Sequence, residues 1–181
     1  MHIAITGNLG SGKSTVAAIL AEKLGYETYS TGSVQRQAAA DMGITTLELN
    51  ERMMTDPALD HIIDDTVTKI SIERDHIIFD SRMAWHFAKN AFRVFITVDI
   101  NEAARRVFAA SRGDVESYAT VDDAKNSLEK RAALERERFL DIYGVDYNDM
   151  SNYNFVIDST DSTPELTAEK IIAAFREAAG E

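Results

Sequence analysis

The sequence predicts an α/β fold, a three-layer sandwich in which a five-stranded parallel sheet carries helices on both faces. Short apolar runs alternate along the chain with longer segments whose apolar residues recur at helical spacing. Some of the runs, such as Ile77-Ile78-Phe79, are apolar throughout, which is typical of strands buried on both faces of a parallel sheet. The 181 residues contain no linker or repeat, so we expect one domain over 1–181.

The order of the elements follows from apolar periodicity and from residues that begin or end helices. Glycines at 25 and 43 are expected to end helices, and Asp56-Pro57 to begin one, with Asp56 as the N-cap. We expect two mainly helical segments, at about 31–75 and about 112–150, to extend over the edge of the sheet. Strands are expected at 2–6, 27–30, 76–80, 92–99 and 153–158, and helices at 13–24, 31–42, 57–70, 101–111, 120–142 and 164–179.

Composition excludes several functions. The formal net charge is −11, and an acidic surface repels nucleic-acid polymers, so we expect none as a partner. The chain has no cysteine, which excludes disulfides, thiolate metal sites and cysteine nucleophiles. No apolar run approaches the roughly 18 residues that span a membrane, and no secretory signal is visible. We expect a cytoplasmic monomer without membrane contact.

The first motif predicts a phosphate-binding loop. Residues 7–14 read GNLGSGKS and match GxxxxGK[ST] between an apolar strand and an amphipathic helix. Glycines let backbone N–H groups turn toward an anion, and the helix N-terminus adds partial positive charge. We expect Lys13 to reach the β- and γ-phosphates and Ser14 to bind Mg²⁺. The motif predicts a nucleotide site but does not by itself separate kinases from other P-loop proteins.

Two further clusters follow predicted strands, at the edge where α/β proteins bind ligands. Ser33 and Arg36 lie just after the strand at 27–30, and Arg36 either grips a phosphate or is a solvated surface arginine. Asp80 ends the next strand, where a carboxylate can hold water on a nucleotide-bound Mg²⁺. Asp80 could equally cap a helix, and Arg82 could bind the phosphate of the acceptor.

The third cluster lies on the long charged helix. Arg131, Glu135 and Arg138 fall within about 60° of one another on a helix. Two arginines oriented by the glutamate could stabilise a phosphoryl group during its transfer. The alternative is a solvated face held by salt bridges between successive turns.

With these residues in hand, the chain resembles the cytidylate kinase family, especially its compact archaeal-type enzymes. The resemblance covers nearly the whole chain. It rests on the segments 7–15, 30–36, 80–82, 138–146 and 153–158, together with Arg131 and Glu135. The chain departs from the family pattern at Asn8-Leu9, Ser81, Met83 and Ala132; the difference at Met83 leaves the base of the acceptor open. Asp60 or Asp64 could read the amino group of cytosine, or could lie on an exposed helix face.

The resemblance implies a P-loop NTPase fold and a kinase that uses ATP and Mg²⁺ to phosphorylate CMP or dCMP. It implies Arg36 and Arg82 on the acceptor phosphate, Arg131 and Arg138 as lid arginines, and Arg106 and Arg112 near the donor nucleotide, whose base would lie beside 159–161. The expected catalytic residues are Lys13, Arg82, Arg131 and Arg138; the donor site is Gly7, Asn8, Leu9, Gly10, Ser11, Gly12, Lys13, Ser14, Thr15 and Arg112; the acceptor site is Ser33, Arg36, Asp80 and Arg82; and the metal ligands are Ser14 and Asp80.

Two other functions remain open from the sequence. One is a small P-loop kinase for a different monophosphate or for a metabolite that is not a nucleotide. The other is a regulatory protein that binds a nucleotide without turnover, although the number of arginines expected at one sheet edge argues against it.

Overall fold

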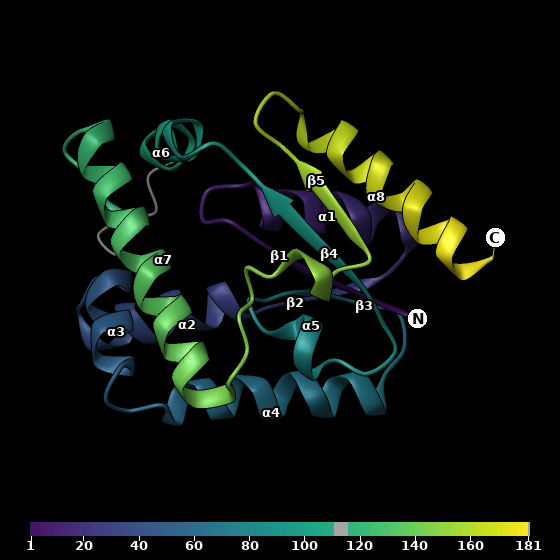
Figure 1. Cartoon of the computed structure of the whole chain (residues 1–181), viewed down its shortest axis with the longest axis horizontal. Coiled ribbons are helices and arrows are strands. Elements are labelled where there is room, and N and C mark those ends of the chain that lie inside the picture. Colours follow the sequence, from purple (N-terminus) through teal and green to yellow (C-terminus); the bar gives the residue numbers. More distant parts are fainter. Residues whose placement is uncertain (111–115, 181) are drawn as a thin grey trace.

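The computed structural model describes residues 1–110 and 116–180. Its five strands form one sheet in the order β2-β3-β1-β4-β5, and every neighbouring pair is parallel (Figure 1). The predicted five-stranded parallel sheet is therefore confirmed. The strands are β1 (His2–Gly7), β2 (Glu27–Ser30), β3 (Ile77–Asp80), β4 (Ala91–Thr97) and β5 (Phe155–Asp158).

The central strand, β1, fixes where ligands can approach. All six of its residues are buried because β3 and β4 pair with its two sides and helices cover both faces. Ile5 pairs with Asp80 of β3, and Gly7 pairs with Ile96 of β4. The carboxyl ends of three strands therefore meet at one edge, which is where open parallel sheets bind ligands.

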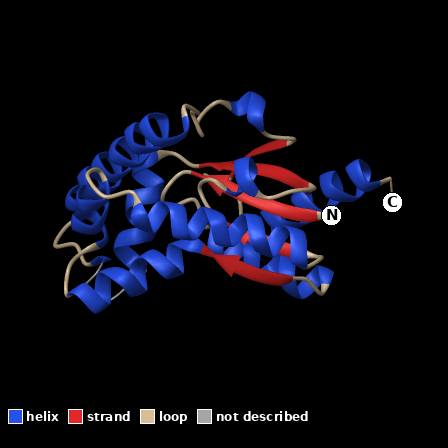
Figure 2. Cartoon of the chain, turned by 90° about the horizontal axis from the view of Figure 1, so that it is seen from below, coloured by secondary structure: helices blue, strands red, loops and turns tan. Residues whose placement is uncertain are grey.

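Helices cover both faces of the sheet. On one face, α1 (Lys13–Leu24) and α8 (Pro164–Ala179) pack on each other, and Leu20, Ile171 and Phe175 join the core there. On the other face lie α4 (Ala58–Glu73) and the short α5 (Ala84–Phe87). Both termini lie at the end of the molecule opposite α7 in Figure 1, and Figure 2 also shows them at one end.

The remaining helices gather near the carboxyl ends of the strands. They are α2 (Thr31–Met42), α3 (Thr46–Met53), α6 (Ile100–Ala109) and the long α7 (Val121–Tyr143). The 3₁₀ turn η2 (Met150–Asn152) instead lies just before β5, at the amino end of that strand. Helix α7 packs on both α6 and α3 (Figure 1). It therefore joins the two sides of the molecule across the strand ends.

The structure differs from the sequence prediction at several boundaries. A separate helix, α3, begins at a capping box of Thr45 and Glu48 that the prediction overlooked, and α5 was not predicted either. Strand β4 stops at Thr97 because the Asp99 carboxylate accepts hydrogen bonds from the first N–H groups of α6. Asp56 accepts the N–H of Ala58 as a capping residue would, but Pro57 precedes the first helical residue. Within the described ranges, no helix combines the length and apolar character that crossing a membrane requires.

Candidate functional site

The loop between β1 and α1 has a backbone that favours glycine. Gly7, Gly10 and Gly12 have φ values of 152°, 77° and 84°, in the region that other residues rarely adopt. A Cβ on Gly7 would lie 2.2 Å from the carbonyl oxygen of Ile96, and one on Gly10 would lie 2.9 Å from the side chain of Ala103. The loop thus combines close packing against β4 and α6 with the N-terminus of α1, an arrangement suited to an anion.

Lys13 curls back over this loop. Its Nζ donates hydrogen bonds to the carbonyl oxygens of Gly7 (3.1 Å) and Asn8 (2.8 Å). Burial lowers the pKa of Lys13 well below its usual value, and the nearby charge of Arg82 acts in the same direction. A phosphate bound at the loop would favour the charged lysine, so anion binding and protonation of Lys13 are expected to be coupled.

Three oxygen-bearing side chains meet beside the loop. The Asp80 carboxylate accepts hydrogen bonds from the hydroxyls of Ser14 (2.7 Å) and Ser30 (3.0 Å). Hydroxyl and carboxylate oxygens are hard ligands, and Mg²⁺ on nucleotides is commonly held by few protein oxygens plus phosphates and water. These residues therefore fit a magnesium ion brought in by a nucleotide. Asp80 does not cap α5, the helix that follows it, because the N-cap there is Met83 and no side chain makes a capping hydrogen bond.

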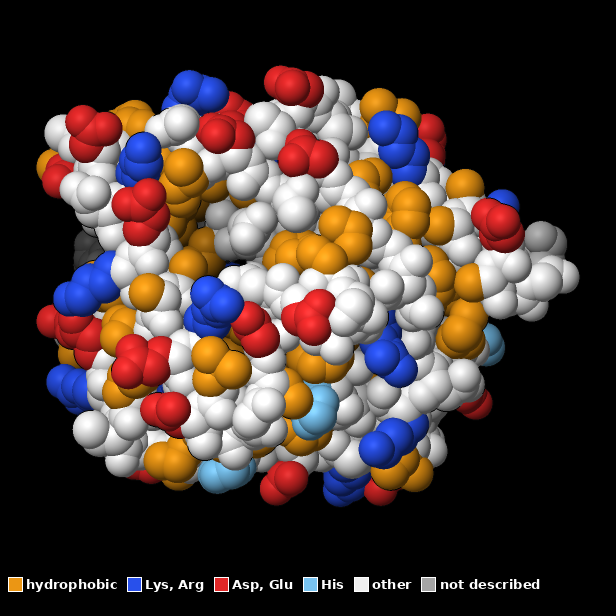
Figure 3. Space-filling model, viewed as in Figure 1, with side chains coloured by type: hydrophobic (Ala, Val, Ile, Leu, Met, Phe, Trp, Pro, Cys, Tyr) orange, Lys and Arg blue, Asp and Glu red, His pale blue; other side chains and the backbone are white. Residues whose placement is uncertain are grey.

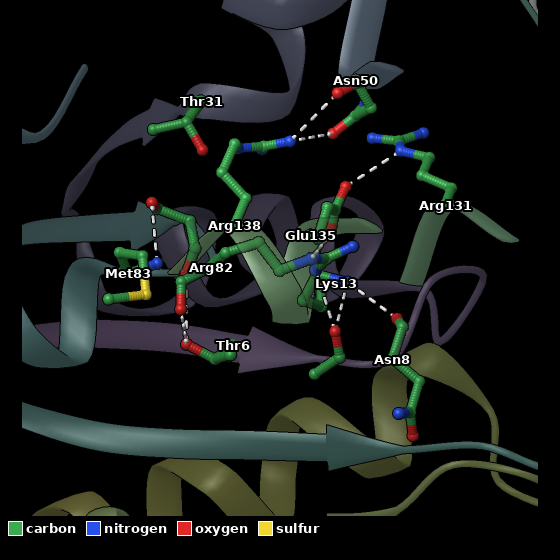
Figure 4. A network of polar contacts seen from close by, with 12 residues as sticks. Thr6, Asn8, Lys13, Thr31, Asn50, Arg82, Met83, Arg131, Glu135 and Arg138 are labelled. Carbon is green, nitrogen blue, oxygen red and sulfur yellow. Dashed lines mark hydrogen bonds and ion pairs between the residues drawn. The ribbon is translucent and has the colours of Figure 1, made fainter. Parts of the chain in front are cut away.

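A chain of buried ion pairs runs from the loop to α7 (Figure 4). Arg82 donates from Nη1 to the Gly7 carbonyl (2.8 Å) and from Nε to Glu135 (2.7 Å). The other carboxylate oxygen of Glu135 accepts from Arg131 (2.9 Å), which also donates to Glu116 at 2.9 Å. One carboxylate thus orients two guanidinium groups beside Lys13.

The charge of Glu135 is strongly favoured in this setting. Burial alone would favour the neutral acid, but the charges of Arg82 and Arg131 hold the pKa of Glu135 at about 2. Glu135 and Arg131 are only 1% and 7% exposed, so the alternative of a solvated, salt-bridged helix face is wrong.

Arg138 lies apart from this chain. It is 2% exposed, its Nε lies 2.8 Å from the Asp60 carboxylate, and Nη1 donates to the side chain of Asn50 at 3.0 Å. Arg138 is not among the residues that line the cleft, whereas Arg82 and Arg131 are. Its expected action on the transferred phosphoryl group stays a prediction.

Arg36, Arg82 and Arg131 share one cleft with the loop. It extends from Lys13, Ser14 and Thr15 of the loop toward α2 and α4. Figure 3 shows a hollow on this face, between the surface over α6 and α7 and the rest of the molecule. The far end is lined by Gly32, Gln35, Arg36, Asp60, Ile63 and Asp64.

Arg36 faces the cleft from α2, and its Nη2 donates to the hydroxyl of Ser33 at 3.2 Å. Ser33 itself does not line the cleft. Asp60 and Asp64 are 2% and 5% exposed, which excludes the alternative of an exposed helix face.

A second cavity lies on the other side of the loop, lined by residues such as Gly12, Thr15, Arg106 and Thr167. Arg106 donates to the carbonyl oxygens of Ser159 (2.7 Å) and Thr160 (2.9 Å), and Glu102 holds the same guanidinium at 2.9 Å. The expected donor-side residues Arg106 and Ser159 therefore lie together. Arg112, expected in the same region, lies outside the described residues.

The sequence prediction missed two contributors. Glu116 lies 15 residues before its partner Arg131, in a segment with no readable motif. Asn50 lies on the unpredicted helix α3, 88 residues from Arg138. Only the fold brings these groups together, so local spacing gave no signal for either.

The sheet order, the loop and the cleft together define the class of fold, that of the P-loop kinases. The shikimate kinase of Aquifex aeolicus superposes with a TM-score of 0.56 over 99% of this chain and 98% of that chain, at 17% identity. The deoxyadenosine kinase of M. mycoides superposes with a TM-score of 0.53 over 98% of this chain and 100% of that chain, at 19% identity.

The chain belongs to the cytidylate kinase-like family, whose model matches residues 2–161. It is 38% identical over 167 residues to a cytidylate kinase of Natronomonas pharaonis, covering 91% of this chain and 84% of that protein. It is 32% identical over 176 residues to a cytidylate kinase of Thermoplasma volcanium, covering 95% and 90%. It is also 35% identical over 175 residues to an S-adenosylmethionine-dependent nucleotide dehydratase of Lacinutrix mariniflava, of which the match covers 36%, against 96% of this chain. The chain thus spans about a third of the length of that relative.

Proposed function

We propose that the protein transfers the γ-phosphate of ATP to CMP or dCMP, giving CDP or dCDP. The observation that carries this proposal is the single cleft that joins the phosphate loop to Arg36 and Arg82 and to the buried carboxylates of Asp60 and Asp64. A kinase that brings two anionic substrates together needs cations between them. The cleft gathers Lys13, Arg36, Arg82 and Arg131 in a chain whose net charge is −11. The cytidylate kinases among its relatives support the nature of the acceptor.

In the proposed reaction, the bond between the γ-phosphorus and the oxygen bridging to the β-phosphate breaks. A phosphate oxygen of the acceptor forms the new bond to phosphorus in line with the leaving group. That oxygen is already anionic, so no protein base is required and no covalent enzyme intermediate forms. The work of the protein is positioning and charge stabilisation.

Each group in the cleft has a role in this scheme. Lys13 leaves its carbonyl partners to bind the β- and γ-phosphates. Arg82 and Arg131, held by Glu135, stabilise charge on the transferred group, and Arg36 with Arg82 binds the acceptor phosphate. Mg²⁺ held near Ser14 and Asp80 would neutralise charge on the donor phosphates.

A second candidate is a different acceptor. The similarity to a nucleotide dehydratase involves only about a third of that relative, so the chain could serve as one module of a larger nucleotide-processing protein. The acidic end of the cleft still favours an acceptor that presents N–H donors. A regulatory protein without turnover is disfavoured because the arginines line the same cleft as the phosphate loop.

An acceptor panel tests the proposal. ADP release from ATP, coupled to an optical signal, is measured with CMP, dCMP, UMP, AMP, shikimate and no acceptor, at fixed magnesium. We expect CMP and dCMP to give the highest kcat/KM and the reaction without acceptor to be far slower. Turnover with another acceptor but not with CMP or dCMP would disprove the proposal, and tight ATP binding without turnover on any acceptor would favour the regulatory alternative.

A further inference from the structure

The acceptor end of the cleft combines apolar side chains with carboxylates. Ile63 of α4, Met83 just before α5 and Phe139 of α7 supply apolar surface. Asp60 and Asp64, one helical turn apart on α4, supply carboxylates on the same lining. Apolar walls with a few polar groups are the usual construction of a site that reads one ring by its edge.

The two carboxylates are not equivalent. Asp60 lies 2.8 Å from the guanidinium of Arg138, and both side chains are almost fully buried, so its charge is balanced inside the protein. Among the described residues, no cation forms such an ion pair with Asp64. Its Oδ2 accepts a hydrogen bond from the hydroxyl of Tyr143, and its Oδ1 accepts none from the residues that the structure describes.

Asp64 is a largely buried residue that lines the cleft, and the residues that the structure describes leave its Oδ1 open to a ligand. Its exposed fraction is only 5%. A carboxylate oxygen in the cleft with no protein donor can accept a hydrogen bond from a bound ligand. The surroundings agree, since burial raises the pKa of Asp64 to about 7 even though the Tyr143 hydrogen bond opposes the shift.

We propose that Asp64 reads the base of the acceptor nucleotide, accepting a hydrogen bond from the exocyclic amine of cytosine and rejecting the carbonyl oxygen that uracil has in its place. This inference rests on the proposed function. Cytosine and uracil are nearly the same size, so shape cannot separate them. A site built around a hydrogen bond can, because the wrong base leaves two acceptors facing each other.

Tyr143 is the positioning residue in this scheme. Its hydroxyl fixes one oxygen of Asp64 and leaves the other for the ligand. Its ring packs against Phe139, with centroids 6.2 Å apart, so the same helix supplies both an apolar wall and the group that orients the carboxylate. Tyr143→Phe keeps the ring and removes the hydroxyl, and we expect it to weaken the preference for cytosine less than a change at Asp64 does.

The decisive variant is Asp64→Asn, with Asp65→Asn as its matched control. Asp65 is the adjacent residue of α4 and is exposed. An asparagine can turn its NH₂ toward the carbonyl oxygen of uracil, so we expect kcat/KM for CMP to fall about tenfold or more while kcat/KM for UMP holds or rises. The KM for ATP should stay unchanged, and the control should behave as the wild-type protein.

Two other results would overturn the inference: equal losses for CMP and UMP, as a structural role predicts, or unchanged selectivity. Equilibrium titration of CMP and UMP without ATP gives a second readout of the same preference. If the wild-type protein turns over neither CMP nor dCMP, the proposed function fails, while the titration still decides the role of Asp64. Similar affinity of the wild-type protein for both nucleotides would then refute it.

Discussion

Replacing Glu135 by glutamine tests whether the buried arginines depend on one carboxylate. The substitution keeps the shape of the side chain and removes the charge that pairs with Arg82 and Arg131 at 2.7 and 2.9 Å. The pKa of Glu135 falls from its usual 4.5 to about 2, and at roughly 1.4 kcal/mol per unit the charge contributes about 3 kcal/mol to folding. Removing one partner of a buried ion pair costs a similar amount, about 3–5 kcal/mol.

We therefore expect Glu135→Gln to lower the free energy of unfolding by about 3 kcal/mol at pH 7. For a chain of this size that corresponds to a Tm lower by about 6–12 °C. Because the folded pKa lies below the unfolded one, the contribution of Glu135 is complete above about pH 5 and is lost as the pH falls toward 2. The difference between wild type and variant should therefore shrink from pH 7 to pH 3.

Urea unfolding followed by circular dichroism measures these differences, with Glu137→Gln as the control. Glu137 is exposed on the same helix, so its change should stay within about 0.5 kcal/mol. The variant leaves two guanidinium groups without their carboxylate, so inorganic phosphate should raise its Tm more than that of the wild type. A variant as stable as the wild type at both pH values would refute the reasoning.

Three further predictions concern the loop and the two ends of the cleft. Arg82→Ala should lower kcat by about 10²–10³-fold while ATP affinity, measured by calorimetry, stays nearly intact; an equal loss of both would assign Arg82 to the donor site or the fold. Gly10→Ala should abolish ATP binding in the same titration, because its Cβ would lie 2.9 Å from Ala103, whereas normal binding would show that the loop can shift. The preference for CMP over UMP, as a ratio of kcat/KM values, should fall as the pH drops through about 7, because neutral Asp64 can donate to uracil; a ratio that stays flat from pH 6 to 8 would count against it.

The predicted fall in the preference for CMP at low pH depends on the groups that face Asp64. Burial is the largest cause of its raised pKa, the Tyr143 hydroxyl opposes the shift, and Asp60 and Asp65 on the same helix add to it. The charge of Arg138 on α7 opposes it slightly, and Tyr29 of β2 also lies close enough to interact. CMP and UMP carry the same phosphate, so titration of the ligand cancels in the ratio.

Elements with their own start and stop signals were predicted from the sequence almost residue by residue. Helix α1 ends at Gly25 in the left-handed conformation, and α8 begins at Pro164 after the Thr163 cap, both as local rules require. Helix α3 carries an equally clear local signal in the capping box of Thr45 and Glu48. Short α5 has no cap and only four residues, so its formation depends on packing against β1 and α4.

The site was predictable where one strand or one helix carries its residues. The loop at 7–14 and the pair Asp80 and Arg82 follow strands, so the parallel sheet brings them to one edge. Helical spacing correctly placed Arg131 next to Glu135, but it could not tell a buried face from a solvated one. That distinction depends on partners such as Asp60 for Arg138 and Glu116 for Arg131, which only the tertiary fold supplies.

The most direct test of the account uses one ligand that carries both substrates, adenosine and cytidine joined through five phosphates. A cleft in which donor and acceptor phosphates meet over the same cations should bind one such molecule per chain. We expect an affinity about 100-fold or more above that of ATP or CMP alone, with displacement by either nucleotide. Affinity no higher than that of ATP, with no displacement by CMP, would contradict a shared site for the two phosphates.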